Sequence, residues 1–150
     1  MSNARSTIIG LGEFKAQLGR ISKSMRGAML AKAATSGLVL VQNVAAQKAP
    51  KRTRDLARSI HTEILDQKDT SVEAAVGTDK VYAAIQEFGG VVVPKKARLL
   101  HWVDEAGNDV FARKVTIPPH PYLRPAWDEK EDAMIQEVKD SLIDTIKAAL

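Results

Sequence analysis

The 150-residue sequence contains no cysteine. This absence excludes disulfides, metal sites built on thiolates and cysteine nucleophiles, and it fits synthesis in a reducing cytoplasm. Aromatic residues make up only 5% of the chain, and the most basic stretch, residues 48–58, contains none of them. That stretch therefore lacks the stacking platforms on which proteins hold single-stranded nucleic acid.

Long apolar runs are also missing. No stretch approaches the 18 or so consecutive apolar residues of a membrane span, and residues 1–14 are too poor in large apolar side chains for a signal-peptide core. The hydrophobic fraction of 45% and the charged fraction of 27% are typical of soluble globular proteins. We therefore expect a single domain over 1–150, with residues 1–12 as the segment best able to be flexible, and no contact with a membrane.

The groupings that catalysis or cofactor binding would require are absent too. His61, His101 and His120 lie far apart in the sequence and lack a second ligand at a helical spacing. No serine lies in a nucleophile-elbow motif. Lys15 occupies the third glycine position after Gly10-Leu11-Gly12, so this segment is interpreted as the turn before a helix. We expect no catalytic residue, no cofactor, no metal and no enzymatic activity.

The charges that are present form a gradient along the chain. Residues 1–58 contain eleven basic and two acidic side chains, whereas residues 101–150 contain six basic and ten acidic ones. A chain polarised in this way can bind nucleic acid through its basic half, or it can place that half against an acidic surface of itself or of a neighbouring copy. Both hypotheses remain open at this point. The side chains expected to contact a subunit or DNA are Lys48, Lys51, Arg52, Arg54 and Arg58.

Two long helices are predicted near the two ends of the chain. Apolar residues at alternating spacings of three and four indicate a helix over about 13–47, which Pro50 ends. Gly19, Gly27 and Gly37 each cost this helix roughly 1 kcal/mol relative to alanine. A second helix is predicted to start near Pro125, with the acidic residues 128–132 favouring its N-terminal end. Its expected buried stripe consists of Ile135, Val138, Leu142, Ile146 and Leu150.

Between the long helices the pattern predicts short elements. Thr53 is expected to cap a short helix that carries Leu56 and Ile60 on one side. Alternation indicates strands over 60–64 and 72–76, and a short helix over 81–88 should end at two glycines. A projecting hairpin is predicted over 99–115. The fold class is α+β, with a long N-terminal helix and a C-terminal helix packed on an antiparallel β-sheet with short connecting helices.

Two short motifs are interpreted as framework. The first runs from Tyr82 to Gly90 and is a helix stopped by glycines, and the second, residues 118–127, is a proline-rich connector that leads into the last helix. Neither motif requires catalysis. The residues expected to form these turns and anchors, together with those around the first short helix, are Pro50, Thr53, Leu56, Tyr82, Glu87, Phe88, Gly89, Pro121, Leu123 and Pro125.

In this order, the motifs resemble those of the tail-completion and head-tail joining proteins of tailed bacteriophages, often called minor tail or neck proteins. The resemblance covers nearly the whole chain. One position departs from it: Arg54 stands where the family usually has glycine after threonine. The matching segments are Ile9-Gly10-Leu11, Ala49-Pro50, Thr53, Leu56, Ser59-Ile60, Tyr82-Ala83, Glu87-Phe88-Gly89 and 121–126.

The resemblance implies a structural protein of the virion, at the head-tail junction or tail end, that is assembled in the bacterial cytoplasm. Its expected partners are copies of itself in a hexameric ring, and tail-tube and head-connector proteins. Two other functions are weighed against this one. The first is a DNA-binding accessory protein that uses the basic half without reading sequence, and the second, less favoured, is a small-molecule enzyme.

Overall fold

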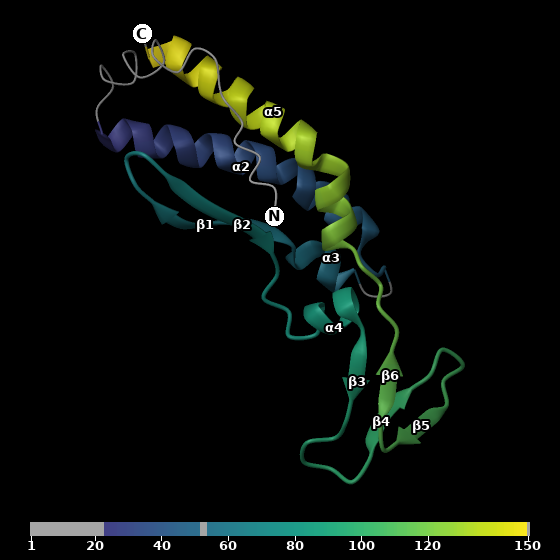
Figure 1. The fold of residues 1–150 in the computed structure, drawn as a ribbon. Coiled ribbons are helices and arrows are strands. Elements are labelled where there is room, and N and C mark those ends of the chain that lie inside the picture. The colour runs from purple at the N-terminus through teal and green to yellow at the C-terminus, as the bar shows by residue number, and fades with distance from the viewer. Residues whose placement is uncertain (1–22, 52–53, 150) are drawn as a thin grey trace, which may run out of the picture. The chain divides into compact units, whose positions relative to one another are not determined.

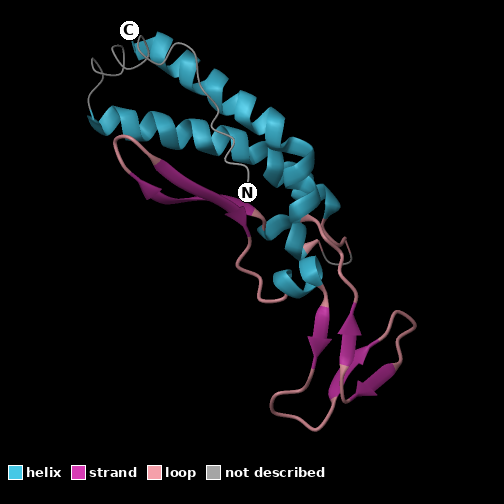
Figure 2. Cartoon of the chain, viewed as in Figure 1, coloured by secondary structure: helices cyan, strands magenta, loops and turns pink. Residues whose placement is uncertain are grey.

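The computed structural model of the chain describes residues 23–51 and 54–149 (Figure 1). Its helices are α2 (Lys23–Lys48), α3 (Asp55–Ser59), α4 (Ala83–Phe88) and α5 (Leu123–Ala149). Its strands are β1 (His61–Gln67), β2 (Val72–Gly77), β3 (Gly90–Val92), β4 (Leu100–Val103), β5 (Asp109–Ala112) and β6 (Val115–Ile117). The predicted α+β class is confirmed, with helices and short strands in alternation (Figure 2). The predicted start of the first helix, near Glu13, lies outside the described residues.

The described strands form three two-stranded ladders, β1–β2, β3–β6 and β4–β5, where one larger sheet was expected. Part of the difference lies in Val115–Ile117. Val115 was expected to end the hairpin, and the next two residues were assigned to no element. These residues form β6, which pairs antiparallel with β3, so that Gly90 lies opposite Ile117 and Val92 opposite Val115. The hairpin proper is β4–β5, which lies within the predicted range 99–115 and turns over 104–108.

The chain divides into two compact units. Within the described residues, the first unit comprises 23–40, 62–75 and 132–149, and the second comprises 41–61 and 76–131 apart from 52–53. Each long helix contributes one end to each unit. The first unit holds the packing of α2 against α5, and the second holds the short helices and the β3 to β6 segment.

In the first unit, α2 and α5 approach each other closely at Gly37 (Figure 1). A Cβ atom at Gly37 would lie 2.6 Å from Val138 Cγ2 and 2.9 Å from the carbonyl oxygen of Met134. Gly37, which costs helix propensity, therefore allows the two backbones to pack together. Of the predicted stripe on α5, Ile146 is buried, whereas Ile135 is 42% exposed, and Leu150 lies outside the described residues. Met134, one residue earlier, faces α2 in place of Ile135.

By length and composition alone, residues Met25–Lys48 of α2 are a candidate membrane span, with a mean hydropathy of 1.2 over the most apolar window. Polar residues such as Lys32, Ser36 and Gln42 interrupt this segment, so it contains no run of about 18 apolar residues. The core helix of a soluble protein passes the same test. In α2, Ala33, Val41 and Ala45 are almost fully buried, and 33% of the apolar window is buried in all.

The close approach at Gly37 predicts the effect of a single methyl group. Gly37→Ala should lower the free energy of unfolding by about 2 kcal/mol, although alanine gains roughly 1 kcal/mol of helix propensity, because the added atom overlaps Val138 and the Met134 carbonyl. Chemical denaturation monitored by circular dichroism measures the change. The adjacent Ser36→Ala, which removes only a hydroxyl bonded to the Lys32 carbonyl, should be nearly neutral. A stabilised Gly37→Ala variant would contradict the packing.

Candidate functional site

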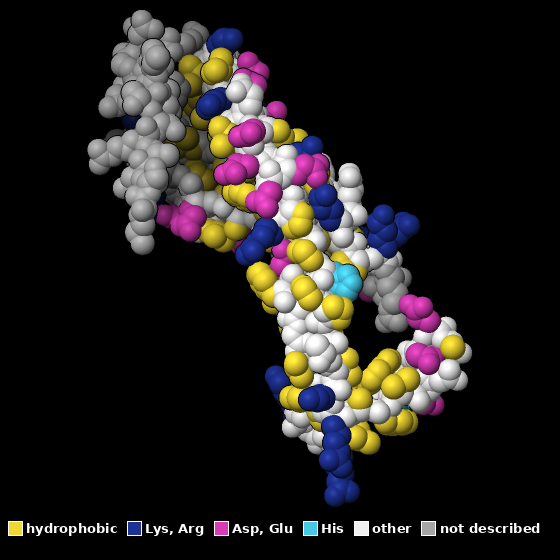
Figure 3. All heavy atoms as spheres, turned by 45° about the vertical axis from the view of Figure 1, so that its right-hand side comes forward, with side chains coloured by type: hydrophobic (Ala, Val, Ile, Leu, Met, Phe, Trp, Pro, Cys, Tyr) yellow, Lys and Arg dark blue, Asp and Glu magenta, His cyan; other side chains and the backbone are white. Residues whose placement is uncertain are grey.

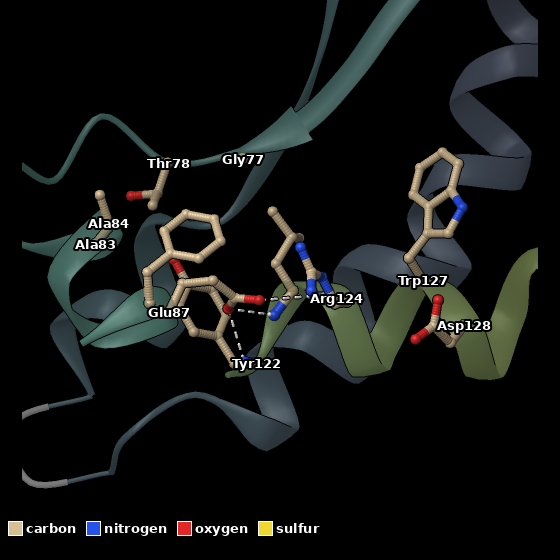
Figure 4. Close-up of a pocket in the computed structure, with 11 residues that line it drawn as sticks. Gly77, Thr78, Ala83, Ala84, Glu87, Tyr122, Arg124, Trp127 and Asp128 are labelled. Atoms are coloured by element: carbon tan, nitrogen blue, oxygen red, sulfur yellow. Dashed lines mark hydrogen bonds between the residues drawn. The ribbon is translucent and has the colours of Figure 1, made fainter. Parts of the chain in front are cut away.

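Glu87 connects the end of α4 to the beginning of α5 (Figure 4). Its side chain is buried, at 8% exposure, and its carboxylate accepts three backbone hydrogen bonds. Glu87 Oε2 accepts from the N–H groups of Tyr122 at 2.7 Å and Leu123 at 2.9 Å, and Oε1 accepts from the N–H of Arg124 at 2.9 Å. The first N–H groups of a helix have no partner within it. Glu87 therefore caps α5 from a position 36 residues upstream of Leu123.

This cap replaces the predicted one. The acidic residues 128–132 were expected to lie at the start of the last helix, but α5 begins at Leu123, and its first turn contains no acidic residue. The negative charge that favours the positive end of the helix comes instead from Glu87. Burial by itself raises the pKa of Glu87, but the hydrogen bonds from Leu123, Tyr122 and Arg124, with the Arg124 charge, together lower that pKa. The carboxyl group is thus held as an anion.

Gly89 fixes the other side of the junction between α4 and α5. It has φ 70°, a conformation that favours glycine, and its N–H bonds to the Ile85 carbonyl to end α4. A Cβ atom at Gly89 would lie 2.8 Å from Pro119 N and 2.9 Å from the Ile117 carbonyl oxygen. The N–H of His120 donates to the Gln86 carbonyl at 2.7 Å. The chain that leaves α4 therefore returns against it before α5 begins.

The other framework residues around the junction divide into buried and exposed ones. Tyr122 is 3% exposed, and burial, followed by the charges of Glu87 and Tyr82, raises its pKa. Leu123 and Pro125 are half-buried, and Pro121 is exposed. Tyr82 and Phe88 are 38% and 67% exposed, which is more than a purely structural anchor needs.

An apolar groove of about 570 Å³ lies beside the capped helix (Figure 4). Phe88 and Trp127 contribute its aromatic rings, and Thr78, Arg124 and Asp128 are its main polar side chains besides Glu87. The Glu87 carboxylate is already satisfied by three amides, and Thr78 Oγ1 lies 2.6 Å from Ser59 Oγ. We call the groove beside the capped helix the anchor groove. Its lining consists of Gly77, Thr78, Ala83, Ala84, Glu87, Phe88, Tyr122, Leu123, Arg124, Trp127 and Asp128.

A second groove, of about 650 Å³, is basic. It brings together three of the five cations singled out from the sequence, Lys48, Lys51 and Arg54, while Arg58 is exposed on α3 and Arg52 lies outside the described residues. Lys48 Nζ lies 2.9 Å from Glu129 Oε2, so one basic side chain pairs with the acidic helix of the same chain. We call this second groove the basic groove. Its lining consists of Val44, Ala46, Gln47, Lys48, Lys51, Arg54, Ala57 and Glu129.

The turn before α3 differs from the prediction. The residue that precedes the helix is Arg54, which makes no side-chain capping bond, and the expected cap, Thr53, lies outside the described residues. Arg54 has φ 58° and ψ 6°, the left-handed conformation that glycine adopts without strain. This geometry explains why glycine suits the position that Arg54 occupies. Leu56 and Ile60 are both buried, as the sequence predicted, and Pro50 is half-buried beyond the end of α2.

The β3 to β6 segment exposes apolar side chains that sequence reasoning treated only as strand formers. We call residues 90–117 the arm. The β4–β5 hairpin lies beyond the end of the β3–β6 ladder that is farther from α4 (Figure 1). Figure 3 shows hydrophobic side chains along this segment and acidic ones at the tip of the hairpin. The large apolar residues exposed here are Val91, Val93, Leu99, Trp102, Val103 and Phe111.

The Glu87 cap predicts a pH-dependent loss of stability. Glu87→Gln should lower the free energy of unfolding at pH 7 by about 2 kcal/mol, because a neutral amide replaces a buried anion that three N–H groups stabilise. The folded-state pKa lies below the ordinary value of 4.5, so the contribution of the charge is complete above that pH and is lost as the pH falls through the folded-state pKa. Denaturation curves of both proteins across this range should therefore converge at low pH.

Glu129→Gln is the matched control, since its carboxylate forms an exposed ion pair and should contribute less than about 1 kcal/mol. Equal losses in the two variants would contradict the role of Glu87.

The conformation of Arg54 predicts that glycine is better tolerated there than alanine. Arg54→Gly should be more stable than Arg54→Ala by about 1 kcal/mol, because only glycine relieves the left-handed strain. At Arg58, inside α3, the order should reverse. Thermal unfolding of the four variants tests both statements. If the alanine variant is more stable than the glycine variant at both positions, the backbone geometry is contradicted.

Comparisons with known proteins add one match. The family model described as "Bacteriophage HK97-gp10, putative tail-component" matches residues 12–89 of the chain, which is just over half of it. The match ends at Gly89, the residue that stops α4. Comparisons with curated proteins and with solved structures give no match. The chain belongs to the HK97-gp10-like family of bacteriophage tail components.

Proposed function

We propose that this tail component completes the phage tail and joins it to the head as a subunit of a ring. The observation that carries the proposal is the exposed apolar surface of the arm in a chain of the tail-component family. Several large apolar side chains exposed on one segment are typical of surfaces that bind other proteins. A two-stranded hairpin is also only marginally stable alone in water, so the arm gains stability when a neighbour covers it.

The proposed role is structural and not catalytic. Among the described residues, no group of three or more His, Asp or Glu side chains could hold a metal ion. In the anchor groove, the Glu87 carboxylate is engaged by backbone amides. Those bonds hold helices in place, which is what a component that must keep its shape in an assembly requires. The proposed partners are copies of the chain, tail-tube proteins and head-connector proteins.

A ring requires two different complementary surfaces on each subunit. The exposed arm and the grooves of the second unit are two such surfaces. Both have an apolar part, and the basic groove has a positive charge that acidic side chains of a partner can match. These features support a head-to-tail contact between subunits more than a two-fold contact of one patch with itself.

Deleting the gene should leave filled heads and detached tails in lysates examined by electron microscopy. Joined particles should return when the wild-type chain is supplied from a plasmid, and the same plasmid carrying a stop codon is the control. Normal virions without the protein would overturn the proposed function. Empty heads would instead assign it to an earlier step of assembly.

A further inference from the structure

We propose that the tip of the β4–β5 hairpin binds the basic groove of a second copy of this chain. The inference deepens the proposed ring, on which it rests, by naming the two surfaces that meet. The arm contributes an acidic tip with apolar flanks, and the groove contributes cations around an apolar floor. None of the residues that line the basic groove belongs to the hairpin.

The tip and the groove have opposite charges. Asp104, Glu105 and Asp109 lie in the turn and at its edge, and residues 99–112 include no lysine or arginine. The basic groove has Lys48, Lys51 and Arg54 against the single carboxylate of Glu129. Opposite potentials of this kind steer subunits together and fix the register of the contact.

The apolar parts of the two surfaces also correspond. On one face of the hairpin, Val103 and Phe111 are 51% and 61% exposed, and Trp102, on the opposite face, is 38% exposed. Side chains of Val44, Ala46 and Ala57 line the groove among its charges. A contact with an apolar centre and charges around it is the usual arrangement of a protein interface.

The hairpin tip is ordered by its own hydrogen bonds. Asp104 Oδ1 accepts from the N–H groups of Ala106 and Asn108, both at 2.9 Å, and Gly107 has φ 85°. At the base of the tip, His101 Nε2 lies 2.6 Å from Asp109 Oδ1, and the His101 ring stacks on Phe111 with centroids 4.7 Å apart. A tip held in one shape loses little conformational entropy on binding.

Within the described residues, Glu105 makes no hydrogen bond or ion pair. It is exposed at the turn, so its charge is available to a neighbour, unlike those of Asp104 and Asp109. Glu105 is therefore the side chain whose reversal should weaken the contact without disturbing the hairpin.

Nucleic acid is the competing occupant of the basic groove, and it fits less well. Glu129 lies among the cations, 2.9 Å from Lys48, and would repel a phosphate backbone. Non-specific duplex binding at physiological salt depends on several phosphates being neutralised together, whereas this groove has a small excess of positive charge. An acidic loop with apolar flanks matches the mixed lining better.

Because the chain has no cysteine, single cysteines can test the contact between full-length chains. One chain carries Ala106→Cys, next to Glu105, and a purification tag, and an untagged chain carries Gln47→Cys in the basic groove, so that the charges of both surfaces are kept. Mild oxidation of this mixture should give a mixed disulfide. In a control mixture, a Glu137→Cys chain replaces the untagged chain. The yield should be about tenfold higher in the first mixture, because steering concentrates the tip at the groove. Glu137 is an equally exposed acidic residue on α5.

Charge reversal gives a second readout that does not need cysteines. Glu105→Lys and Arg54→Glu should each raise the apparent dissociation constant of the oligomer about tenfold in sedimentation experiments, and an equimolar mixture of the two variants should recover much of the loss, because their changed charges attract. Glu73→Lys, the same change at the exposed position of β2, should have little effect.

Several results would overturn the inference. Mixed disulfides no more abundant than in the Glu137→Cys mixture would do so, as would a predominance of disulfides between two Ala106→Cys chains. Duplex DNA binding that Lys51→Glu abolishes, without a selective disulfide, would assign the groove to nucleic acid. If phages that carry Glu105→Lys join heads to tails normally, whereas phages that lack the gene do not, the inference fails and the proposed function stands. Normal virions from the deletion would overturn the proposed function, whereas the disulfide and sedimentation results decide whether the tip and the groove meet.

Discussion

The three hydrogen bonds that Glu87 accepts from the start of α5 are the interaction on which the second unit depends. They satisfy N–H groups that a helix cannot satisfy by itself, and they place the carboxylate charge at the positive end of the helix dipole. The N–H of His120 bonds to the Gln86 carbonyl, and Pro119 touches Gly89. The chain between these contacts is therefore a loop whose two ends are held together at α4.

The contacts that hold the two ends of this loop together at α4 explain how the arm forms. Residues 90–117 leave α4 and return to it, so β3 and β6 pair where the two ends run alongside each other, and the hairpin forms beyond them. Glu87 and Tyr122 are buried at the base, but the arm has few residues that it could bury against. Its apolar side chains consequently stay exposed, and a protein neighbour is the natural cover for them. The same anchor that stabilises the unit thus creates the surface on which the proposed assembly depends.

The charge gradient of the sequence is used partly within the chain. Lys48 and Glu129, from the basic and the acidic ends, form an ion pair in the second unit, so one of the two hypotheses left open by the sequence holds for this pair. Exposed ion pairs contribute little to stability. Most of the remaining basic and acidic side chains are exposed, where they influence which surfaces come together more than whether the chain folds.

The sequence by itself determined the α+β class, the order of the elements and the end of α4 at Gly89. These depend on local periodicity, on glycine and proline, and on turn composition, which act over a few residues. It also determined that Leu56 and Ile60 would be buried on one side of a short helix. Only the tertiary structure decided what caps α5, because Glu87 and Leu123 are 36 positions apart and no local pattern joins them.

The same reason accounts for the other differences. Pairing of β3 with β6 joins two three-residue strands across the whole hairpin, and short strands have too little alternation to identify their partners. From the sequence, Gly37 only lowers the helix propensity of α2. Its role in the close packing of α2 against α5 depends on Met134 and Val138, which lie far from it in the sequence. Helices, turns and charges follow from neighbours in the sequence, whereas the cap, the ladder and the grooves follow from residues that folding alone brings together.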